Sequence, residues 1–186
     1  MHKTIYILSI LFIIHSCDDK KHIRKYSIPK LVSESAQQNK IIKSTNQSRF
    51  KWVAPEYWML GKESSMRIGS YKIPYQDKFA DLSITFFKGD GGGLLQNINR
   101  WRGQLNLQEA TLSEVNNSAY IGNSSLGIYK MYKIFNVDDL SRAFLCFVVT
   151  LDESTLFLKL DSSFDGIEFL ENELKSFMSS FEFIYE

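Results

Sequence analysis

The stretch ADLSITFFKGDGGGLLQNINRWRGQLNL, residues 80–107, decides the fold because it holds a strand, a turn and a helix in succession. Apolar and polar residues alternate over Asp81–Phe87, which predicts a strand with one apolar face. The next five residues, Gly89-Asp90-Gly91-Gly92-Gly93, predict a turn. The apolar face of the strand consists of Leu82, Ile84 and Phe86, and its polar face of Ser83 and Thr85.

A helix is predicted over Leu94–Arg102, because apolar residues recur there at helical spacing. Gly103 follows the last predicted turn, where a glycine in the left-handed conformation often ends a helix. The apolar face of this helix consists of Leu94, Ile98 and Trp101.

The same patterns predict further strands on both sides of this unit. In the second strand, Met66 and Ile68 are expected on one face, and Arg67, Tyr71 and Ile73 on the other. Residues 74–79 are expected to form a polar loop, and residues 106–123 an irregular connection with a short turn of helix or strand around Glu114–Ile121. The predicted flanking strands are Phe50–Val53, Ser65–Ile73, Ser125–Phe135, Ala143–Leu151, Thr155–Leu160 and Phe181–Ile184.

A second helix is predicted near the C-terminus, where Asp165 and Glu168 have the spacing of a capping box. Strand hairpins with two amphipathic helices predict an α+β fold, an antiparallel β-sheet covered by helices. The apolar stripe of the second helix consists of Ile167, Leu170, Leu174, Phe177 and Met178.

Length and charge limit the function classes. The 186 residues have room for one domain and its appendages, and the formal net charge of +1 gives no reason to expect nucleic acid as a partner. Charge is nevertheless uneven, because residues 17–48 carry +4 and residues 49–186 carry −4. We therefore expect a basic tether followed by a single globular domain over residues 49–186.

The N-terminus predicts export. Ile5–Ile14 is a mostly apolar run after a positive start, too short to span a membrane and of the length of a secretory signal. The following residues, Ile14-His15-Ser16-Cys17, resemble the lipobox of bacterial lipoproteins, although His15 stands where a small residue is usual. The resemblance implies cleavage after residue 16 and a lipid anchor on Cys17. The alternative is an ordinary signal peptide in which the cysteine is incidental.

A lipid anchor of several acyl chains would hold the protein stably on a bacterial membrane, at the periplasmic or the cell-surface face. Residues 17–48 lack periodicity and are rich in polar residues, which predicts a disordered tether. Its basic charge either lies in solvent or rests against anionic lipid head groups.

The folded part resembles the PsbP-like fold, which includes extrinsic photosystem subunits and lipid-anchored periplasmic proteins of the DcrB type. The order of elements, Trp52, Pro55 and Trp58 near the start, and a closing helix followed by Ser180-Phe181-Glu182-Phe183 carry this resemblance. The centre also resembles a family of uncharacterised exported bacterial proteins with a GDxGG…NxNRWRGQ pattern, matched here by residues 89–92 and 97–104. Lys88 departs from that pattern, which usually has proline there. This second resemblance implies kinship and no activity.

The glycine turn ahead of a helix suggests an anion site, because free backbone N–H groups and the positive end of the helix dipole point the same way. No Gly-Lys-Ser/Thr follows, so the turn is not a nucleotide P-loop. The alternative is structural: the glycines permit a tight turn, Trp101 belongs to the core, and the arginines pair with acids such as Asp81 or Asp90. The candidate ligand or partner surface consists of Arg67, Gly89, Asp90, Gly91, Gly92, Asn97, Arg100, Trp101 and Arg102.

An enzyme is not expected. The three histidines, His2, His15 and His22, all precede the predicted domain, which excludes His-based triads and His-based metal sites within it. Cys146 lies in a continuous apolar run that predicts a strand buried on both faces, so we expect a structural thiol. Carboxylate, Lys or Tyr chemistry stays open as an alternative, but the paired acids Asp138-Asp139 and Asp152-Glu153 lie at predicted turns, where charge is expected. We therefore expect no catalytic residue, no metal and no cofactor.

Two hypotheses remain. The first is a non-catalytic interaction module, anchored through Cys17, that docks on an envelope protein through the Arg67, Arg100 and Arg102 region and the loop over residues 104–123. The second is a small anionic-ligand-binding protein that uses the turn over residues 89–93 and the following helix N-terminus.

Overall fold

The computed structural model describes residues 49–184. The signal peptide predicted for residues 1–16, the tether over residues 17–48 and the lipidation of Cys17 lie outside the described residues. No helix among those described is long and apolar enough to cross a membrane.

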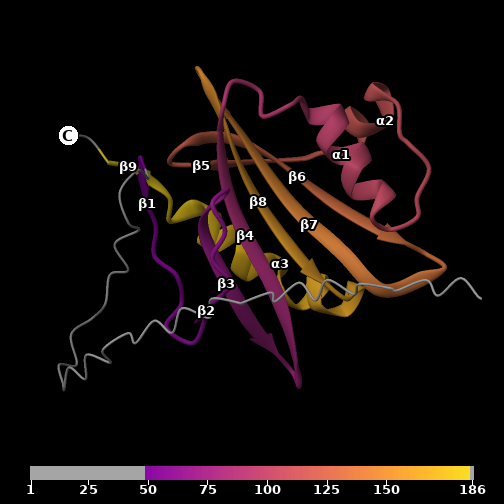
Figure 1. Cartoon of the computed structure of the whole chain (residues 1–186), viewed down its shortest axis with the longest axis horizontal. Helices are drawn as coiled ribbons and strands as arrows, with labels where there is room; N and C mark the ends of the chain where they lie inside the picture. The colour runs from indigo at the N-terminus through magenta and orange to yellow at the C-terminus, as the bar shows by residue number, and fades with distance from the viewer. Residues whose placement is uncertain (1–48, 185–186) are drawn as a thin grey trace, which may run out of the picture. The chain divides into compact units, whose positions relative to one another are not determined.

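The described residues form an α+β structure built on one seven-stranded antiparallel sheet (Figure 1). The strand order is β2-β3-β4-β8-β7-β6-β5, and β1 and β9 form a separate pair. The predicted fold class is therefore confirmed. The strands are β1 (Phe50–Lys51), β2 (Met59–Leu60), β3 (Arg67–Tyr75), β4 (Lys78–Lys88), β5 (Tyr120–Ser124), β6 (Gly127–Asn136), β7 (Asp139–Leu151), β8 (Ser154–Ser162) and β9 (Glu182–Phe183), and the helices are α1 (Leu94–Gly103), α2 (Leu112–Asn117) and α3 (Phe164–Ser179).

Helices cover both faces of the sheet, and alternate residues of β7 belong to different cores. Leu145, Phe147 and Val149 pack with the stripe of α3, whereas Phe144, Cys146 and Val148 pack with α1 and α2. This confirms that β7 is buried on both faces. The two faces predicted for β4 are also confirmed, because Leu82 and Ile84 pack in the core that contains the stripe of α3. The apolar face predicted for α1 is confirmed as well, because Ile98 and Trp101 pack in the core on the opposite side of the sheet.

The hairpin between β3 and β4 is tighter than predicted. Residues 74–79 are not a polar loop, because both strands continue through them and only Gln76 and Asp77 form the turn. Gln76 adopts a positive φ of 48° there. Pro74 and Phe79 pair across the hairpin, so a proline in the sequence did not end the strand.

The prediction for the two faces of β3 is wrong at Arg67, because the strand contains a β-bulge. The register shifts between Arg67 and Gly69, where Arg67 pairs with Thr85 and Gly69 pairs with Ile84. Because a bulge adds a residue to one strand, alternation is interrupted there. Arg67 therefore lies on the face of Asp81, and not with Tyr71 and Ile73 as predicted.

The ends of the helices also differ from the prediction. The N-cap of α3 is Ser163, whose hydroxyl accepts the N–H of Gly166, while Asp165 lies in the first turn. Glu168 forms no capping box and instead contacts Lys133 at 2.6 Å. Gly103 is still helical, and the residue with positive φ is Asn106.

The connection over residues 106–123 is more ordered than predicted. It contains α2, which begins with a complete capping box between Thr111 and Glu114. It also contains β5, which pairs with β6 around a turn at Ser125 and Leu126. The long strand predicted for Ser125–Phe135 therefore begins two residues later, at Gly127.

Candidate functional site

The glycine turn joins β4 to α1 through backbone conformations that favour glycine. Gly91 has a φ of 62°, and a Cβ atom added there would lie 2.6 Å from the Phe157 ring. Both facts require glycine at this position because side chains rarely tolerate that φ and the ring leaves no space. The turn thus packs directly on the sheet.

The backbone N–H groups of the turn bind atoms of the protein itself. Gly92 N–H donates to Asp90 Oδ1 at 3.0 Å, and Gly93 N–H donates to the Asp90 carbonyl at 3.2 Å. Gly89 N–H donates to the Glu153 carbonyl at 2.7 Å. The carboxylate of Asp90 therefore binds one of the N–H groups that an external anion would need.

Asn97 fixes this turn from inside α1. Its side-chain NH₂ donates to the carbonyls of Gly91 at 2.9 Å and Gly93 at 2.8 Å. Its Oδ1 accepts from Arg100 Nη2 at 2.8 Å. The buried Asn97 side chain thus satisfies turn carbonyls, which is a structural role.

The other residues of α1 that were predicted for the candidate surface lie in different environments. Trp101 is 4% exposed and stands edge-on to the Phe157 ring, with 6.0 Å between ring centroids, so it belongs to the core. Arg102 Nε donates to the Gln108 carbonyl at 2.8 Å. Among residues 49–184, neither Arg100 nor Arg102 forms an ion pair with Asp81 or Asp90.

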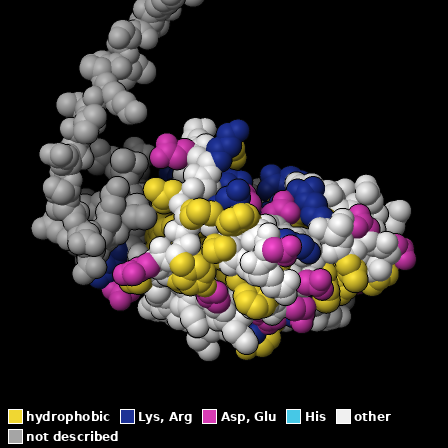
Figure 2. Space-filling view, turned by 90° about the horizontal axis from the view of Figure 1, so that it is seen from below, with side chains coloured by type: hydrophobic (Ala, Val, Ile, Leu, Met, Phe, Trp, Pro, Cys, Tyr) yellow, Lys and Arg dark blue, Asp and Glu magenta, His cyan; other side chains and the backbone are white. Residues whose placement is uncertain are grey.

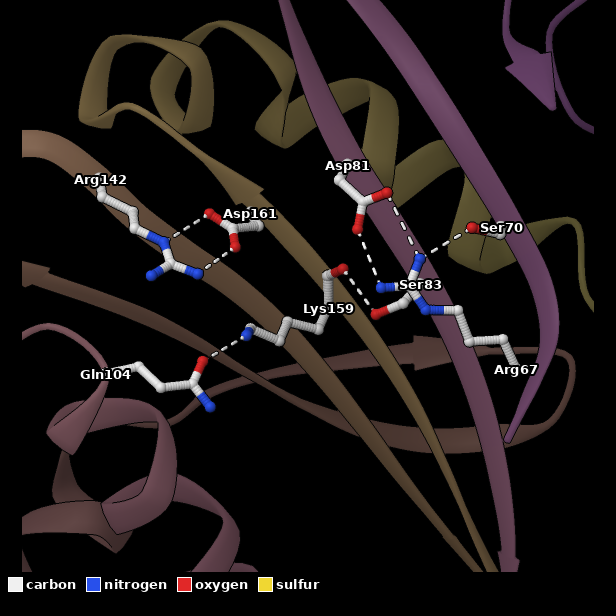
Figure 3. A network of polar contacts seen from close by, with 8 residues as sticks. All are labelled: Arg67, Ser70, Asp81, Ser83, Gln104, Arg142, Lys159 and Asp161. Carbon is white, nitrogen blue, oxygen red and sulfur yellow. Dashed lines mark hydrogen bonds and ion pairs between the residues drawn. The ribbon is translucent and has the colours of Figure 1, made fainter. Parts of the chain in front are cut away.

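Arg67 instead joins a set of polar side chains on β4, β7 and β8. Its guanidinium contacts Asp81 through two nitrogens, at 3.0 and 3.3 Å, and donates to Ser70 Oγ at 2.8 Å. Arg142 contacts Asp161 in the same two-pronged way, at 2.7 and 3.1 Å. We call the set of Arg67, Asp81, Ser83, Arg142, Lys159 and Asp161 the charged face (Figure 3).

Strand register explains how this face is assembled. In β4 and β8, Asp81 lies opposite Asp161 and Ser83 lies opposite Lys159. The two arginines come from the outer neighbours β3 and β7 and each neutralises one aspartate. Figure 3 shows these side chains in front of the strands, with α3 behind the sheet. α3 therefore does not cover the charged face.

Lys159 lies between the two arginine–aspartate pairs. Its Nζ donates to Gln104 Oε1 at 3.0 Å and stands 3.6 Å from the centroid of the Phe144 ring. Burial lowers the pKa of Lys159. Within the described part of the chain no carboxylate lies within ion-pair distance of its ammonium group.

Sequence reasoning missed Lys159, Arg142 and Asp161. A signal was present, because Lys159 and Asp161 alternate with the apolar Leu158 and Leu160, as Asp81 and Ser83 alternate with Leu82 and Ile84. The alternation identifies polar faces, but it does not tell which strands are neighbours.

The surface elsewhere mixes apolar and charged residues, as Figure 2 shows for one side of the molecule. Exposed hydrophobic side chains occur at both edges of the sheet, with Met59 and Leu60 on β2 and Tyr120 and Ile121 on β5. Scattered apolar residues are normal on protein surfaces. The charged face is distinct from them because it lies on the inner strands.

Metal-ligating side chains and the thiol of Cys146 are the remaining reactive groups to place in residues 49–184. No three His, Cys, Asp or Glu side chains in that range are grouped so that they could hold a metal ion. Cys146 is fully buried, and burial raises the pKa of its thiol. The structural role expected for this thiol agrees with its position under the charged face, opposite Lys159 in the neighbouring strand.

Comparisons with known proteins find similarity in the solved structures only. No protein-family model matches the chain, and no curated protein matches it. Cyanobacterial PsbP (CyanoP) from Synechocystis sp. PCC 6803 is 14% identical, with 73% of this chain and 87% of that chain covered and a TM-score of 0.47. A protein from Bacteroides thetaiotaomicron is 15% identical, with 74% of this chain covered and a TM-score of 0.45.

The chain covers 46% of the Bacteroides protein, which is about half of its length. Both similarities concern the fold alone. The similarity to the cyanobacterial PsbP is distant, and we take no function from either protein.

Proposed function

We propose that this protein is an exported bacterial lipoprotein, anchored through Cys17, whose folded part is a non-catalytic interaction module of the cell envelope. The apolar run over Ile5–Ile14 and the lipobox-like residues 14–17 support the anchor. Kinship with the exported family that has the NxNRWRGQ pattern, and with anchored proteins of the DcrB type, belongs to the same proposal.

The docking surface of this module is the charged face together with Arg100. The observation that carries this assignment is Lys159, a partly buried cation with no carboxylate partner in the described residues. The positive charges of Arg142 and Arg100 further lower the pKa of Lys159. The face counts four cations against two aspartates and therefore favours a partner that presents a carboxylate.

The arginine–aspartate pairs fix the geometry of this surface. Each pair is only partly exposed, with side-chain exposures of 27% and 47% for Arg67 and Asp81, and 49% and 27% for Arg142 and Asp161. Two-pronged contacts hold both guanidinium groups in a set orientation. An incoming carboxylate then meets Lys159 between two ordered pairs and needs little rearrangement of the surface.

The second hypothesis, an anion site at the glycine turn, stays a prediction. Geometry favours the charged face over it, because Asp90 already accepts an N–H of the turn and places a negative charge there. The proposed surface keeps Arg67 and Arg100 from the predicted set and replaces the glycines with residues of β7 and β8.

Photo-crosslinking in intact cells tests the proposal. A photoreactive amino acid at Gln104, beside Lys159, should give a discrete adduct with an envelope protein, and Lys159→Gln in the same chain should abolish it. The matched probe at Phe169, which is exposed on α3, should not give that adduct. Lys78→Glu serves as the charge control because Lys78 is exposed at the start of β4. No adduct from Gln104, or the same adduct from Phe169, would contradict the proposed surface.

A further inference from the structure

Strand β5 forms one edge of the seven-stranded sheet, and among the described residues it pairs only with β6. In an antiparallel ladder, every second residue directs its N–H and C=O groups away from the paired strand. The outer row of β5 therefore presents hydrogen-bonding groups that no strand within residues 49–184 takes up. The opposite edge of the sheet, β2, is only two residues long.

β5 lacks the features that usually protect an edge strand. Natural edges carry charged residues, proline or bulges, which discourage pairing with another chain. The sequence of β5, Tyr-Ile-Gly-Asn-Ser, has no charged residue and no proline, and its register with β6 is regular over all five pairs. This edge is therefore open to a further strand along its whole length.

Large apolar side chains are exposed on both faces of this edge. Tyr120 and Ile121 project to opposite faces, because side chains alternate along a strand. Ile128 on β6 is the diagonal neighbour of Ile121, which lies opposite Lys130. Each of the three apolar side chains is more than 50% exposed, although Lys175 Nζ stands 4.6 Å from the centroid of the Tyr120 ring. A strand added at this edge would cover apolar surface on both faces.

We propose that β5 pairs antiparallel with β5 of a second copy of this chain, so that two sheets join across a two-fold axis. Full overlap of the two strands places Gly122 opposite Gly122 of the second copy, and Ile121 opposite Asn123 of the second copy. Because β5 is uncharged, no like charges stand opposite each other in this register.

The second copy fits this edge in shape as well as in charge. In the fully overlapped register each large side chain meets a small or polar one, since Tyr120 lies opposite Ser124 of the second copy. Gly122 has no side chain at the centre, where the two backbones approach each other. The same surface serves both chains, so the pair closes as a dimer and leaves only the short β2 edges outside.

The size of the interface sets its strength. Each copy contributes five strand residues, one aromatic ring and two isoleucines, which places the contact at the small end of specific protein interfaces. We therefore expect a weak and reversible dimer. This surface is separate from the charged face, so the dimer does not depend on the proposed docking function.

Disulfide formation between two different variants tests the register. Purified full-length chains in detergent carry Cys17→Ser, which leaves the buried Cys146 as the only natural cysteine, together with Ile121→Cys or Asn123→Cys. A disulfide requires Cα atoms within about 7 Å of each other. In the proposed register, residue 121 lies opposite residue 123 of the second copy but is offset from its own equivalent by two residues, about 7 Å along the strands.

Under mild oxidation, a mixture of the two variants should therefore give a disulfide-linked dimer that neither variant gives alone. Leu60→Cys, exposed on β2, is the control for random collision and should give no such dimer with Ile121→Cys. Equal yields from all combinations, or no linked dimer from the mixture, would overturn the proposed pairing.

Native mass spectrometry of the chain with its natural cysteines tests the dimer itself. With increasing concentration, a species of twice the 21.6 kDa mass should appear. Ile121→Lys places a charge in the interface and should remove this species, whereas Leu60→Lys on the opposite edge should retain it. Both side chains are exposed, and thermal unfolding checks that both variants fold. A monomer at every concentration, a dimer that Ile121→Lys leaves intact, or growth beyond a dimer would overturn the proposal.

Discussion

The ammonium group of Lys159 on β8 stands 3.6 Å from the centroid of the Phe144 ring on β7, although neither residue lies directly opposite the other in the register. A cation over an aromatic face is stabilised by the ring quadrupole, most strongly where water is excluded. The contact keeps a charged side chain folded onto the sheet beside a fully buried ring. It also links the stability of this face to the protonation of Lys159.

Replacement of Lys159 by methionine should change the response of stability to alkaline pH. Burial lowers the pKa of Lys159, so the folded state binds this proton less tightly than the unfolded chain. The contribution of Lys159 to the free energy of unfolding therefore rises as pH increases toward the ordinary lysine pKa of about 10.4. Urea unfolding at several pH values should show the wild type gaining stability relative to Lys159→Met over this range.

The comparison with Lys159→Met is needed because buried tyrosines act in the opposite direction. Burial raises the pKa values of Tyr71, Tyr129 and Tyr132, so their contribution to stability falls as pH rises above about 10. Both proteins contain these tyrosines, and their effect cancels in the difference. A difference in stability that stays constant across the alkaline range would contradict the lowered pKa of Lys159.

Asp81→Asn should cost about 0.5–1 kcal/mol of stability at low salt. The Arg67–Asp81 pair is partly exposed, and exposed ion pairs contribute little. The loss should shrink in 1 M NaCl because salt screens surface charges. Asp77→Asn, at the tip of the same hairpin, is the control and should have almost no effect. A loss well above 2 kcal/mol, or one that salt does not reduce, would indicate a buried role for the pair.

Trp101→Ala should destabilise the protein by about 3–5 kcal/mol, as removal of a buried aromatic side chain does. Its ring is 4% exposed and packs against Phe157. Gln96→Ala, which is exposed on the same helix, should change stability by less than about 0.5 kcal/mol. Urea unfolding measures both values. A Trp101→Ala protein of nearly normal stability would return this residue to the candidate surface.

The N-cap of α3 can be located by two alanine substitutions. Ser163→Ala should cost about 1 kcal/mol, because the hydroxyl of Ser163 accepts the N–H of Gly166 and also contacts the Tyr75 hydroxyl at 3.0 Å. Asp165→Ala should cost only about 0.3–0.5 kcal/mol, through its interaction with the helix dipole. Thermal unfolding of the two variants provides the test. The reverse order of losses would restore the capping box that the sequence predicted at Asp165.

Cys146 should not react with iodoacetamide in the folded protein. Burial raises the pKa of its thiol, so almost none of the reactive thiolate is present at neutral pH. Peptide mass spectrometry should find Cys146 alkylated only when urea is added before the reagent. Rapid alkylation without urea would show that β7 opens to solvent under native conditions.

The sequence predicted those elements whose pattern is local. Alternation along residues 81–87 placed Leu82 and Ile84 on the core face, and helical spacing placed Ile98 and Trp101 on the covered face of α1. The continuous apolar run of β7 identified a strand buried on both faces. These predictions hold because periodicity within one element records which of its sides meets the core.

The prediction failed where competing local signals decide a boundary. Asp165 and Ser163 both suit an N-cap, and the backbone selects Ser163, two residues earlier. Gly103 suits a helix end, yet the positive φ falls at Asn106. The capping box at Thr111 was present in the sequence, but α2 is only six residues long and shows too little periodicity to be recognised.

By itself, then, the sequence determined the class of fold, the strand β7 that is buried on both faces, and the main helices. It also carries the pattern that predicts export. Each of these depends on residues that are close together in the chain. Tertiary structure alone decided which polar side chains meet. The bulge between Arg67 and Gly69 brings Arg67 to Asp81, and the pairing of β4 with β8 brings Ser83 beside Lys159. Lys159 and Gln104 are 55 residues apart in the chain. Such contacts depend on strand register and helix docking, which arise when the whole core packs and which no local pattern encodes.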